Sequence, residues 1–187
     1  MTILNVVLER DAVHVFTDTR ATWPDGSRLA DVPKVIPLPH MRAVIAVRGE
    51  IAALGKASTI ACMCGNSFDE LMGKLALALK AEHSFLGTAD VVVAGWSADG
   101  PQAFAVFTHD GHGIAPFTRF DISYALFTPV LTPSVLKSVE TTGPLRGLPL
   151  AVLDQVQSEP LRCGGVIQVT SVYEHAITAS VAFPAAA

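Results

Sequence analysis

The chain has 187 residues, half of them hydrophobic, with 16% charged residues and a formal net charge of -4 at pH 7. This length suits one substantial core and is short for two, so we expect a single domain over residues 1–187. A nucleic-acid-binding surface needs clustered Lys and Arg, which this composition does not favour. We therefore expect no nucleic-acid partner.

The first apolar run is interrupted by Glu9, Arg10 and Asp11, so the N-terminus does not have the pattern of a secretory signal. A membrane-spanning helix needs about 18 consecutive apolar residues, and the sequence contains no such run. We expect a cytoplasmic protein with no membrane partner. The high hydrophobic fraction favours burial in a core or in the contacts of a homo-oligomer.

The cysteines Cys62, Cys64 and Cys163 are odd in number and form no second pair at metal-ligand spacing. Neither a disulfide framework nor a zinc site is favoured, so we expect three small buried residues. Arg162 is next to Cys163 and could lower the pKa of its thiol, although a lone buried cysteine is the commoner outcome.

A metal site could be suggested by His109, Asp110 and His112, but Asp-Gly in a hairpin turn is sufficient to explain this segment. The sequence therefore predicts no metal and no cofactor.

The first strands are expected at residues 3–8 and 12–18, because β-branched residues dominate both runs and turn-like residues separate them. A Pro-Asp-Gly turn signal follows at residues 24–26, and extended segments resume at 29–38 and 42–47. The N-terminal quarter is thus predicted to be mostly sheet.

Helices are expected next, since apolar residues recur every three or four positions from Ile51 to Ala61. A second helix should begin at Ser67, an N-cap candidate with Glu70 three residues later. The remaining expectations are a hairpin at 88–96 and 102–109 and an extended segment at 114–127. After these we expect a short helix that begins at residues 132–134, a second helix at 148–158, and strands at 166–173 and 176–183.

This order of strands, two helices, strands, two helices and strands indicates an α+β fold. Such a chain can pack two sheets face to face and cover each with a helix pair, which gives four layers as one option among α+β folds.

The chemistry of the sequence is concentrated near the N-terminus. If Met1 is removed, Thr2 carries a hydroxyl and a free α-amine whose ordinary pKa of about 7.7 to 8.0 lets it accept the hydroxyl proton near neutral pH. Asp18 follows Thr2 by sixteen positions, and Lys34 follows Asp18 by sixteen more. A hairpin brings Asp18 back beside Thr2, and a third strand could bring Lys34 alongside both. The lysine would lower the pKa of the amine, and the aspartate would orient the lysine.

This constellation resembles the proteasome β-type subunits and related bacterial proteasome-like peptidases of the N-terminal-nucleophile (Ntn) hydrolase superfamily. The matching positions are Thr2 for the nucleophile, Asp18 for the acid, Arg20 for the supporting arginine and Lys34 for the catalytic lysine. The resemblance implies the four-layer αββα sandwich of two mainly antiparallel sheets.

The chain departs from the family pattern in three places. The small turn that supplies the oxyanion hole is replaced by residues 46–49, so we expect the backbone donors at Arg48 and Gly49. The segment that supplies a supporting serine is replaced by residues 126–133. The later Asp and Ser of the family site fall near Glu159 and Cys163, without a convincing match.

Two functions follow from the resemblance. The first is a threonine-type peptidase acting on polypeptides and assembled as a homo-oligomeric ring, for which the resemblance suggests an ATP-dependent unfoldase as a partner. The second is a non-catalytic structural or assembly subunit of a proteasome-like particle. The two differ at Met1, because retained Met1 makes the Thr2 nitrogen an amide that cannot act as a base.

Overall fold

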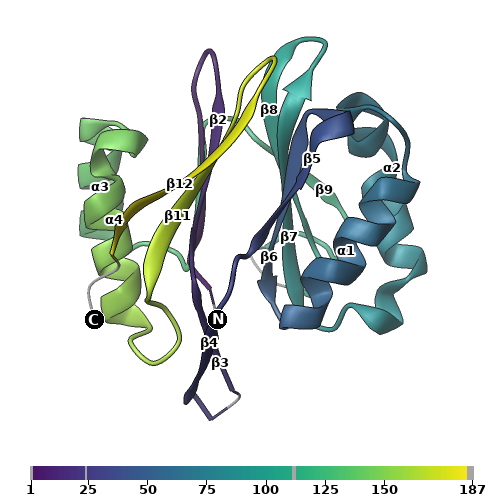
Figure 1. Cartoon of the computed structure of the whole chain (residues 1–187). Helices are drawn as coiled ribbons and strands as arrows, with labels where there is room; N and C mark the ends of the chain where they lie inside the picture. The colour runs from purple at the N-terminus through teal and green to yellow at the C-terminus, as the bar shows by residue number, and fades with distance from the viewer. Residues whose placement is uncertain (1, 24, 111–112, 185–187) are drawn as a thin grey trace.

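A computed structural model describes residues 2–23, 25–110 and 113–184. Figure 1 shows four layers: a helix pair, two sheets packed face to face, and a second helix pair on the opposite side. The expected αββα sandwich is confirmed.

The first sheet contains the predicted N-terminal hairpin. Its strands are all antiparallel and lie in the order β10-β1-β2-β11-β12. Leu4 lies opposite Thr17 in the hairpin, so the first residues of the chain return beside the end of the second strand. The bounds are β1 Leu4–Leu8, β2 Val13–Asp18, β10 Ala125–Thr128, β11 Val166–Val172 and β12 Ile177–Pro184.

The second sheet is also antiparallel and lies in the order β5-β6-β7-β8-β9. A separate two-stranded sheet, β3 with β4, projects at one end of the molecule (Figure 1). The bounds are β3 Arg20–Thr22, β4 Arg28–Asp31, β5 Val35–Leu38, β6 Ala43–Gly49, β7 Ala89–Ser97, β8 Gly100–Phe107 and β9 Arg119–Ile122, with short 3-10 helices at Pro39–Met41 and His83–Phe85.

The helices α1 (Ile51–Met63) and α2 (Phe68–Ala81) cover the second sheet. Ser67 is the N-cap of α2 as predicted, because its Oγ accepts a hydrogen bond of 3.2 Å from the Glu70 N–H. The Glu70 carboxylate accepts from the N–H of Asn66 at 2.7 Å, one residue before the position that a capping box would use.

The helices α3 (Pro133–Thr142) and α4 (Pro144–Ser158) cover the first sheet. The second begins four residues before the predicted start at Leu148. Pro144 suits the first turn of a helix, but Gly147 and Pro149 weaken the helical pattern that follows. A Cβ at Gly147 would lie 2.9 Å from Val139 Cγ2, so close packing of α4 on α3 explains this glycine.

The segment predicted as one extended run at 114–127 forms two strands in different sheets. β9 ends at Ile122 in the second sheet, and β10 begins at Ala125 in the first. The chain thus crosses between the sheets over two residues that carry no Gly or Pro turn signal.

Three apolar layers hold the fold together, and side-chain alternation along each strand assigns residues to them. In β1, Leu4 and Val6 face the second sheet, whereas Val7, and Ile3 just before the strand, face α4. Thr2 precedes Leu4 by two positions, so the alternation places it at the end of the space between the sheets.

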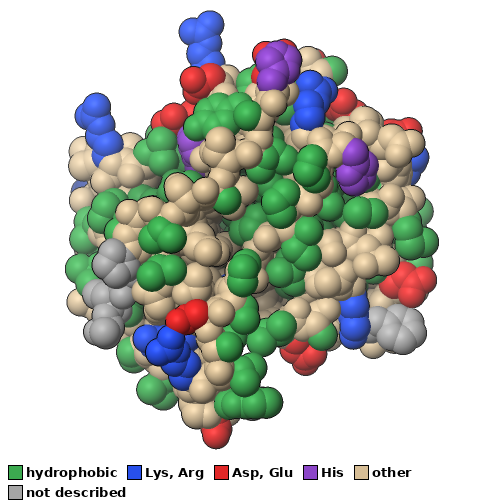
Figure 2. All heavy atoms as spheres, in the orientation of Figure 1, with side chains coloured by type: hydrophobic (Ala, Val, Ile, Leu, Met, Phe, Trp, Pro, Cys, Tyr) green, Lys and Arg blue, Asp and Glu red, His purple; other side chains and the backbone are tan. Residues whose placement is uncertain are grey.

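Some apolar side chains remain exposed, including one cysteine that was predicted to be buried. Cys64 and Cys163 are buried as expected, but Cys62 is exposed. Met63 and Leu77 are 80% and 75% exposed. Figure 2 shows apolar side chains over much of the face in view, interspersed with polar ones.

Within the described parts of the chain, none of the helices is long and apolar enough to cross a membrane.

Candidate functional site

The N-terminal hairpin brings Thr2 and Asp18 to the same end of the first sheet. The Ile3 N–H donates to Asp18 Oδ1 at 2.9 Å, and the Asp18 N–H approaches the Ile3 carbonyl at 3.4 Å. Thr2 is only 5% exposed. The aspartate therefore fixes the backbone of the residue that follows Thr2.

Lys34 reaches Asp18 from the other sheet. It directly precedes β5, and its Nζ donates to Asp18 Oδ1 at 2.7 Å and to the Arg20 carbonyl at 2.6 Å. The three residues are thus brought together as predicted, but not by a third neighbouring strand. The lysine instead spans the space between the two sheets.

Burial controls the protonation of this pair. It raises the pKa of Asp18, an effect opposed by the Lys34 charge and by hydrogen bonds from Lys34, Gly164 and Ile3. Burial also lowers the pKa of Lys34, and the Asp18 charge opposes that shift. A buried lysine whose pKa is lowered is more often in its neutral form, and only the neutral amine can accept a proton from a neighbouring hydroxyl.

Arg20 supports the site through both its backbone and its side chain. Its carbonyl accepts from Lys34, while its guanidinium Nη1 donates to the carbonyls of Pro160 (3.0 Å) and Cys163 (3.1 Å). In the loop that Arg20 binds, the Gly164 N–H donates a hydrogen bond of 2.9 Å to Asp18 Oδ2. The arginine therefore holds the segment that completes the hydrogen bonding of Asp18.

Gly164 was not predicted as a site residue. A Cβ at this position would lie 2.4 Å from Arg20 Cζ, and its φ is +151°. Only glycine lets the backbone approach the guanidinium this closely. The signal in the sequence was the Gly164-Gly165 pair before a strand.

Thr2 and Lys34 line one cavity of about 580 Å³, together with Arg20. The part nearest α1 is largely apolar, and Glu50 and Arg162 are the other charged residues of the wall. Such a wall suits an extended peptide that presents an apolar side chain to it better than a peptide that presents a charged side chain. The apolar lining includes Ala21, Val32, Val47, Ile51 and Leu54.

The predicted oxyanion donors lie at the end of β6. The Val47 N–H donates to the Lys34 carbonyl at 3.4 Å, and the next amide, that of Arg48, faces β7, where Arg48 pairs with Asp90. Of the two predicted donors, the Gly49 N–H is therefore the better candidate. Gly49 lines the cavity, but a Cβ there would lie 2.6 Å from the Thr88 carbonyl oxygen. Packing alone therefore explains that glycine.

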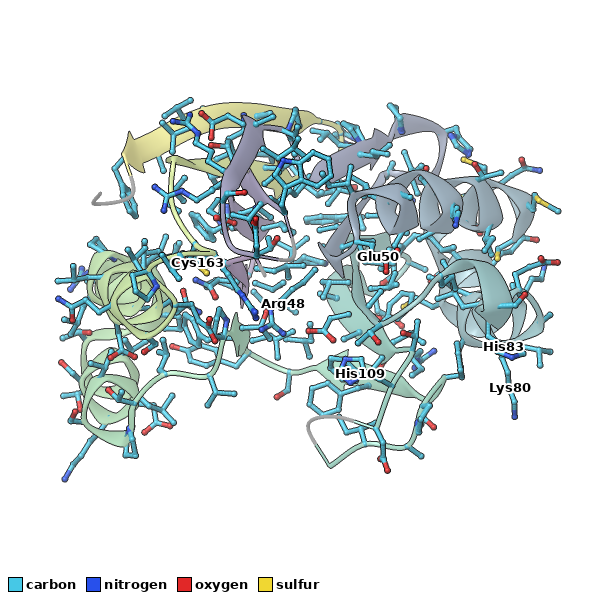
Figure 3. The ribbon with its side chains drawn as sticks, turned by 90° about the horizontal axis from the view of Figure 1, so that it is seen from below. Arg48, Glu50, Lys80, His83, His109 and Cys163 are labelled. Atoms are coloured by element: carbon cyan, nitrogen blue, oxygen red, sulfur yellow. The ribbon has the colours of Figure 1, made fainter. Side chains whose placement is uncertain are left out.

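The Arg48 side chain has a separate role. Its Nη1 donates to Asp90 Oδ2 at 2.8 Å, and Asp90 Oδ1 lies 2.8 Å from His109 Nε2. Figure 3 labels Arg48 near the middle of the view from below, with His109 to one side of it. A strand end tied by a buried carboxylate holds its backbone in a fixed position. The other histidine considered for a metal, His112, lies outside the described residues.

Glu159 and Cys163, which fall near the later Asp and Ser of the family site, have different surroundings. Cys163 is fully buried, and burial followed by the Asp18 charge raises the pKa of its thiol to about 12. Arg162 is exposed and does not activate that thiol. Glu159 contributes its backbone carbonyl, which accepts from the N–H groups of Arg162 and Cys163. Figure 3 shows Cys163 on the side of α4.

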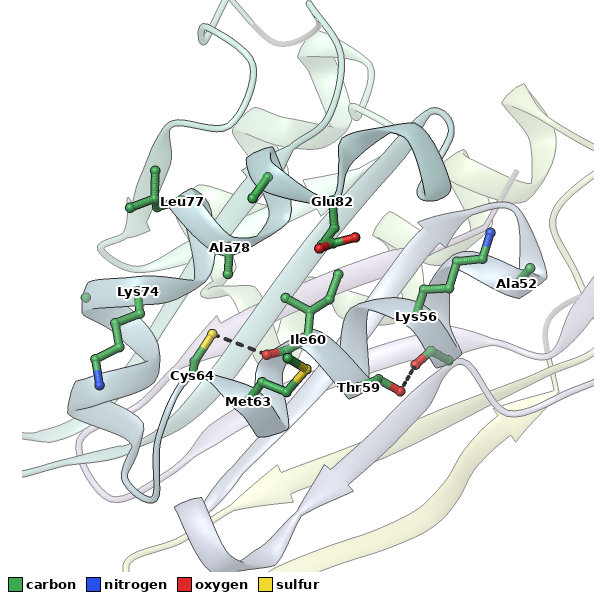
Figure 4. A pocket seen from close by; sticks show the side chains of 13 residues that line it. Ala52, Lys56, Thr59, Ile60, Met63, Cys64, Lys74, Leu77, Ala78 and Glu82 are labelled. Atoms are coloured by element: carbon green, nitrogen blue, oxygen red, sulfur yellow. Dashed lines mark hydrogen bonds between the residues drawn. The ribbon is translucent and has the colours of Figure 1, made fainter.

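A larger cavity, of about 1040 Å³, lies between α1 and α2 (Figure 4). The cysteine in its lining, Cys64, donates to the Ile60 carbonyl at 3.3 Å, and burial raises the pKa of its thiol. The Thr59 hydroxyl in the same lining donates to the Gly55 carbonyl at 3.0 Å, so both of these groups are bound to backbone carbonyls of α1. The smaller cavity at Thr2 is the better candidate for chemistry.

Comparison with known proteins identifies the fold. No protein-family model matches the sequence, and no curated protein does. The chain is similar to a solved structure described as an Anbu (Gly-1) mutant from Hyphomicrobium sp. strain MC1, with a TM-score of 0.76. The alignment covers 98% of this chain and 88% of that one.

The chain shares its fold with Anbu. Their sequences are 10% identical, so the fold is what the comparison with Anbu establishes. The roles of Thr2, Asp18, Arg20 and Lys34 remain predictions, which rest on the geometry described above.

Proposed function

We propose that the chain is a threonine-type Ntn peptidase subunit, active once Met1 has been removed. The observation that carries the proposal is the buried contact of Lys34 Nζ with Asp18 Oδ1 at the wall of the cavity that Thr2 also lines. This contact places a lysine with a lowered pKa in the same cavity as the hydroxyl.

In the first step, Thr2 Oγ1 attacks the carbonyl carbon of a substrate amide while its proton passes to the Thr2 amine or to Lys34. The negative oxygen that forms is stabilised by a backbone donor at the end of β6, where the Gly49 N–H is the candidate. The C–N bond then breaks, and the leaving amine takes the transferred proton. Water hydrolyses the resulting ester and regenerates the hydroxyl.

Asp18 and Arg20 act by positioning. The aspartate holds the ammonium and the Ile3 N–H, and the Arg20 carbonyl holds a second Nζ hydrogen. These contacts restrict Lys34 to one orientation before substrate arrives, which reduces the reorganisation that the reaction requires. The substrate would be a polypeptide, because an open cavity with an apolar wall accepts an extended chain.

The wider proposal is a cytoplasmic homo-oligomeric ring that encloses such sites and receives substrate from an ATP-dependent unfoldase. This wider proposal rests on the resemblance of Thr2, Asp18, Arg20 and Lys34 to the corresponding positions of proteasome-like peptidases.

A non-catalytic assembly subunit is the second candidate, and one observation favours it. Asp18 binds Ile3 just before β1, Lys34 just before β5, and Gly164 of the 160–164 loop. These bonds would stabilise the sandwich even if no reaction took place, so the buried pair also has a purely structural explanation.

The test combines intact mass with turnover of a fluorogenic peptide amide. We expect the purified chain to lack Met1, and Thr2→Ala to lose turnover while keeping its assembly state. Thr2→Ser is the matched control and should retain activity, because it preserves the hydroxyl and the amine. A chain that keeps Met1, or a Thr2→Ala variant that is fully active, would support the second candidate or a site elsewhere.

A further inference from the structure

The last strand, β12, forms an outer edge of the first sheet. It pairs with β11 through Ile177–Val181 in regular register, and the register shifts at Ala182. Figure 1 shows it at the margin of the sandwich, beside β11. Alternate N–H and C=O groups along its outer side therefore have no strand to bind within the described chain.

The other outer strands of the two large sheets each carry a feature that hinders pairing with a further strand. β5 contains Pro37, which has no N–H to donate. β9 contains Arg119 and Asp121, and β10 has four residues and is followed directly by Pro129. Charge, proline and short length are the usual ways in which proteins protect a sheet edge.

By contrast, β12 has eight residues, and none of them is charged. Its only proline is the last residue, Pro184, and its bulge lies near that same end. The run Ile177–Val181 therefore keeps a regular backbone with no protecting feature.

The middle of this strand is also unusually exposed. Ile177 packs against the core between the sheets, and Phe183 packs against the core beneath α4. Between these anchors, Thr178 to Ala182 are all exposed, and Val181 is 60% exposed. Both faces and the outer edge of the strand are thus available.

We propose that β12 binds β12 of a second copy of the chain, antiparallel and across a two-fold axis. A free strand edge is satisfied by another extended backbone, and this contact joins two five-stranded sheets into one. Edge pairing with β5, β9 or β10 of the other copy is disfavoured by the proline, charges and short lengths described above. Self-pairing of β12 is the arrangement that remains, and it closes on itself.

The chemistry of the strand suits self-pairing. With the axis at Ala179, Thr178 lies opposite Ser180 of the partner subunit, and Ile177 lies opposite Val181 of the partner subunit. β-branched and small polar side chains pack well across antiparallel strands. The absence of charge means that two identical strands bring no like charges together. This contact does not depend on whether Thr2 is a nucleophile.

The test uses a matched pair of charged variants of the full chain. Thr178 and Ser180 are two positions apart, so they share one face of the strand, and both are exposed. One variant carries Thr178→Glu and Ser180→Glu, and the other carries Thr178→Lys and Ser180→Lys. Melting temperatures near that of the wild type would show that each variant folds.

Sedimentation over a concentration series gives the assembly state. We expect the wild type to associate, each charged variant alone to fall to a lower assembly state, and an equimolar mixture of the two variants to recover the wild-type state. Hydrogen exchange on the wild type should show amides of residues 177–181 that become more protected as concentration rises.

The control is Leu77→Glu, which places a charge on the exposed face of α2 beside the α1–α2 cavity (Figure 4). We expect this variant to associate like the wild type. The proposal is overturned if the wild type stays monomeric, if both charged variants associate normally, or if the mixture fails to recover. Dissociation by Leu77→Glu alone would place the contact on the α1–α2 face instead.

Discussion

Lys34 Nζ lies 2.7 Å from Asp18 Oδ1, and the two residues belong to different layers of the sandwich. Asp18 ends β2 in the first sheet, whereas Lys34 leads into β5 in the second. Both side chains are buried, at 0% and 8% exposure. One ion pair thus fixes the two sheets to each other at the end of the molecule where Thr2 lies.

Loss of the lysine should therefore destabilise the fold. In Lys34→Met the Asp18 carboxylate stays buried without its cation, and breaking a buried pair in this way typically costs about 3–5 kcal/mol. Urea unfolding at neutral pH measures the loss. Lys137→Met, on the exposed face of α3, is the matched control and should change stability by about 0.5 kcal/mol or less. Equal stability of the two variants would contradict the structural role of the pair.

The same lysine should make stability depend on pH in the alkaline range. Burial lowers the pKa of Lys34 below its ordinary 10.5. Between the lowered value and 10.5, the unfolded chain holds a proton that the folded chain has released, so the contribution of this group to stability rises with pH. The slope is at most about 1.4 kcal/mol per pH unit. The stability difference between wild type and Lys34→Met should widen from neutral pH toward about pH 10. A difference that stays constant would mean that the Lys34 pKa is not lowered.

The sequence predicts the fold well where the local pattern is strong. The N-terminal hairpin, the Ser67 cap and the Val91 to Phe107 hairpin have period-two or helical signals that tertiary contacts reinforce. Helical periodicity does not predict the first turn of α4, because Gly147 and Pro149 interrupt the pattern there. The sequence pattern also fails between Ile122 and Ala125, where the strand changes sheet without a turn residue.

The site is only partly visible in the sequence. The spacing of Thr2, Asp18 and Lys34 suggests that they meet, but the route taken by Lys34 from the second sheet depends on long-range packing. The contribution of Gly164 could not be read, because its N–H contacts a residue 146 positions earlier. Exposure of Cys62 was missed because side-chain type alone does not determine which face of α1 is buried.

Cysteine labelling should separate the three thiols. Cys62 is exposed, whereas Cys163 is fully buried beside Asp18 with a pKa of about 12. At pH 8 a thiol with that pKa is ionised to about one part in ten thousand, and the thiolate is the reactive form. Iodoacetamide should label Cys62 within minutes and leave Cys163 unmodified in the folded chain, as read by peptide mass spectrometry. All three should react in urea. Rapid native labelling of Cys163 would show that the loop at 160–164 opens or that Lys34 activates the thiol.

Gly164→Ala should disturb the site through Arg20. The added Cβ would lie 2.4 Å from Arg20 Cζ at a φ of +151°, so either the guanidinium leaves the carbonyls of Pro160 and Cys163 or the loop moves. Overpacking of this kind typically costs about 1–3 kcal/mol. Gly73→Ala is the control, because the same substitution in the interior of α2 meets nothing within 4 Å and should stabilise the helix by about 0.8–1.0 kcal/mol. Urea unfolding should therefore give shifts of opposite sign, and hydrogen exchange should increase at residues 160–165 in Gly164→Ala alone. If both variants were stabilised, the 160–164 loop would not be packed tightly against Arg20. Arg20 would then not be what positions the Gly164 N–H beside Asp18.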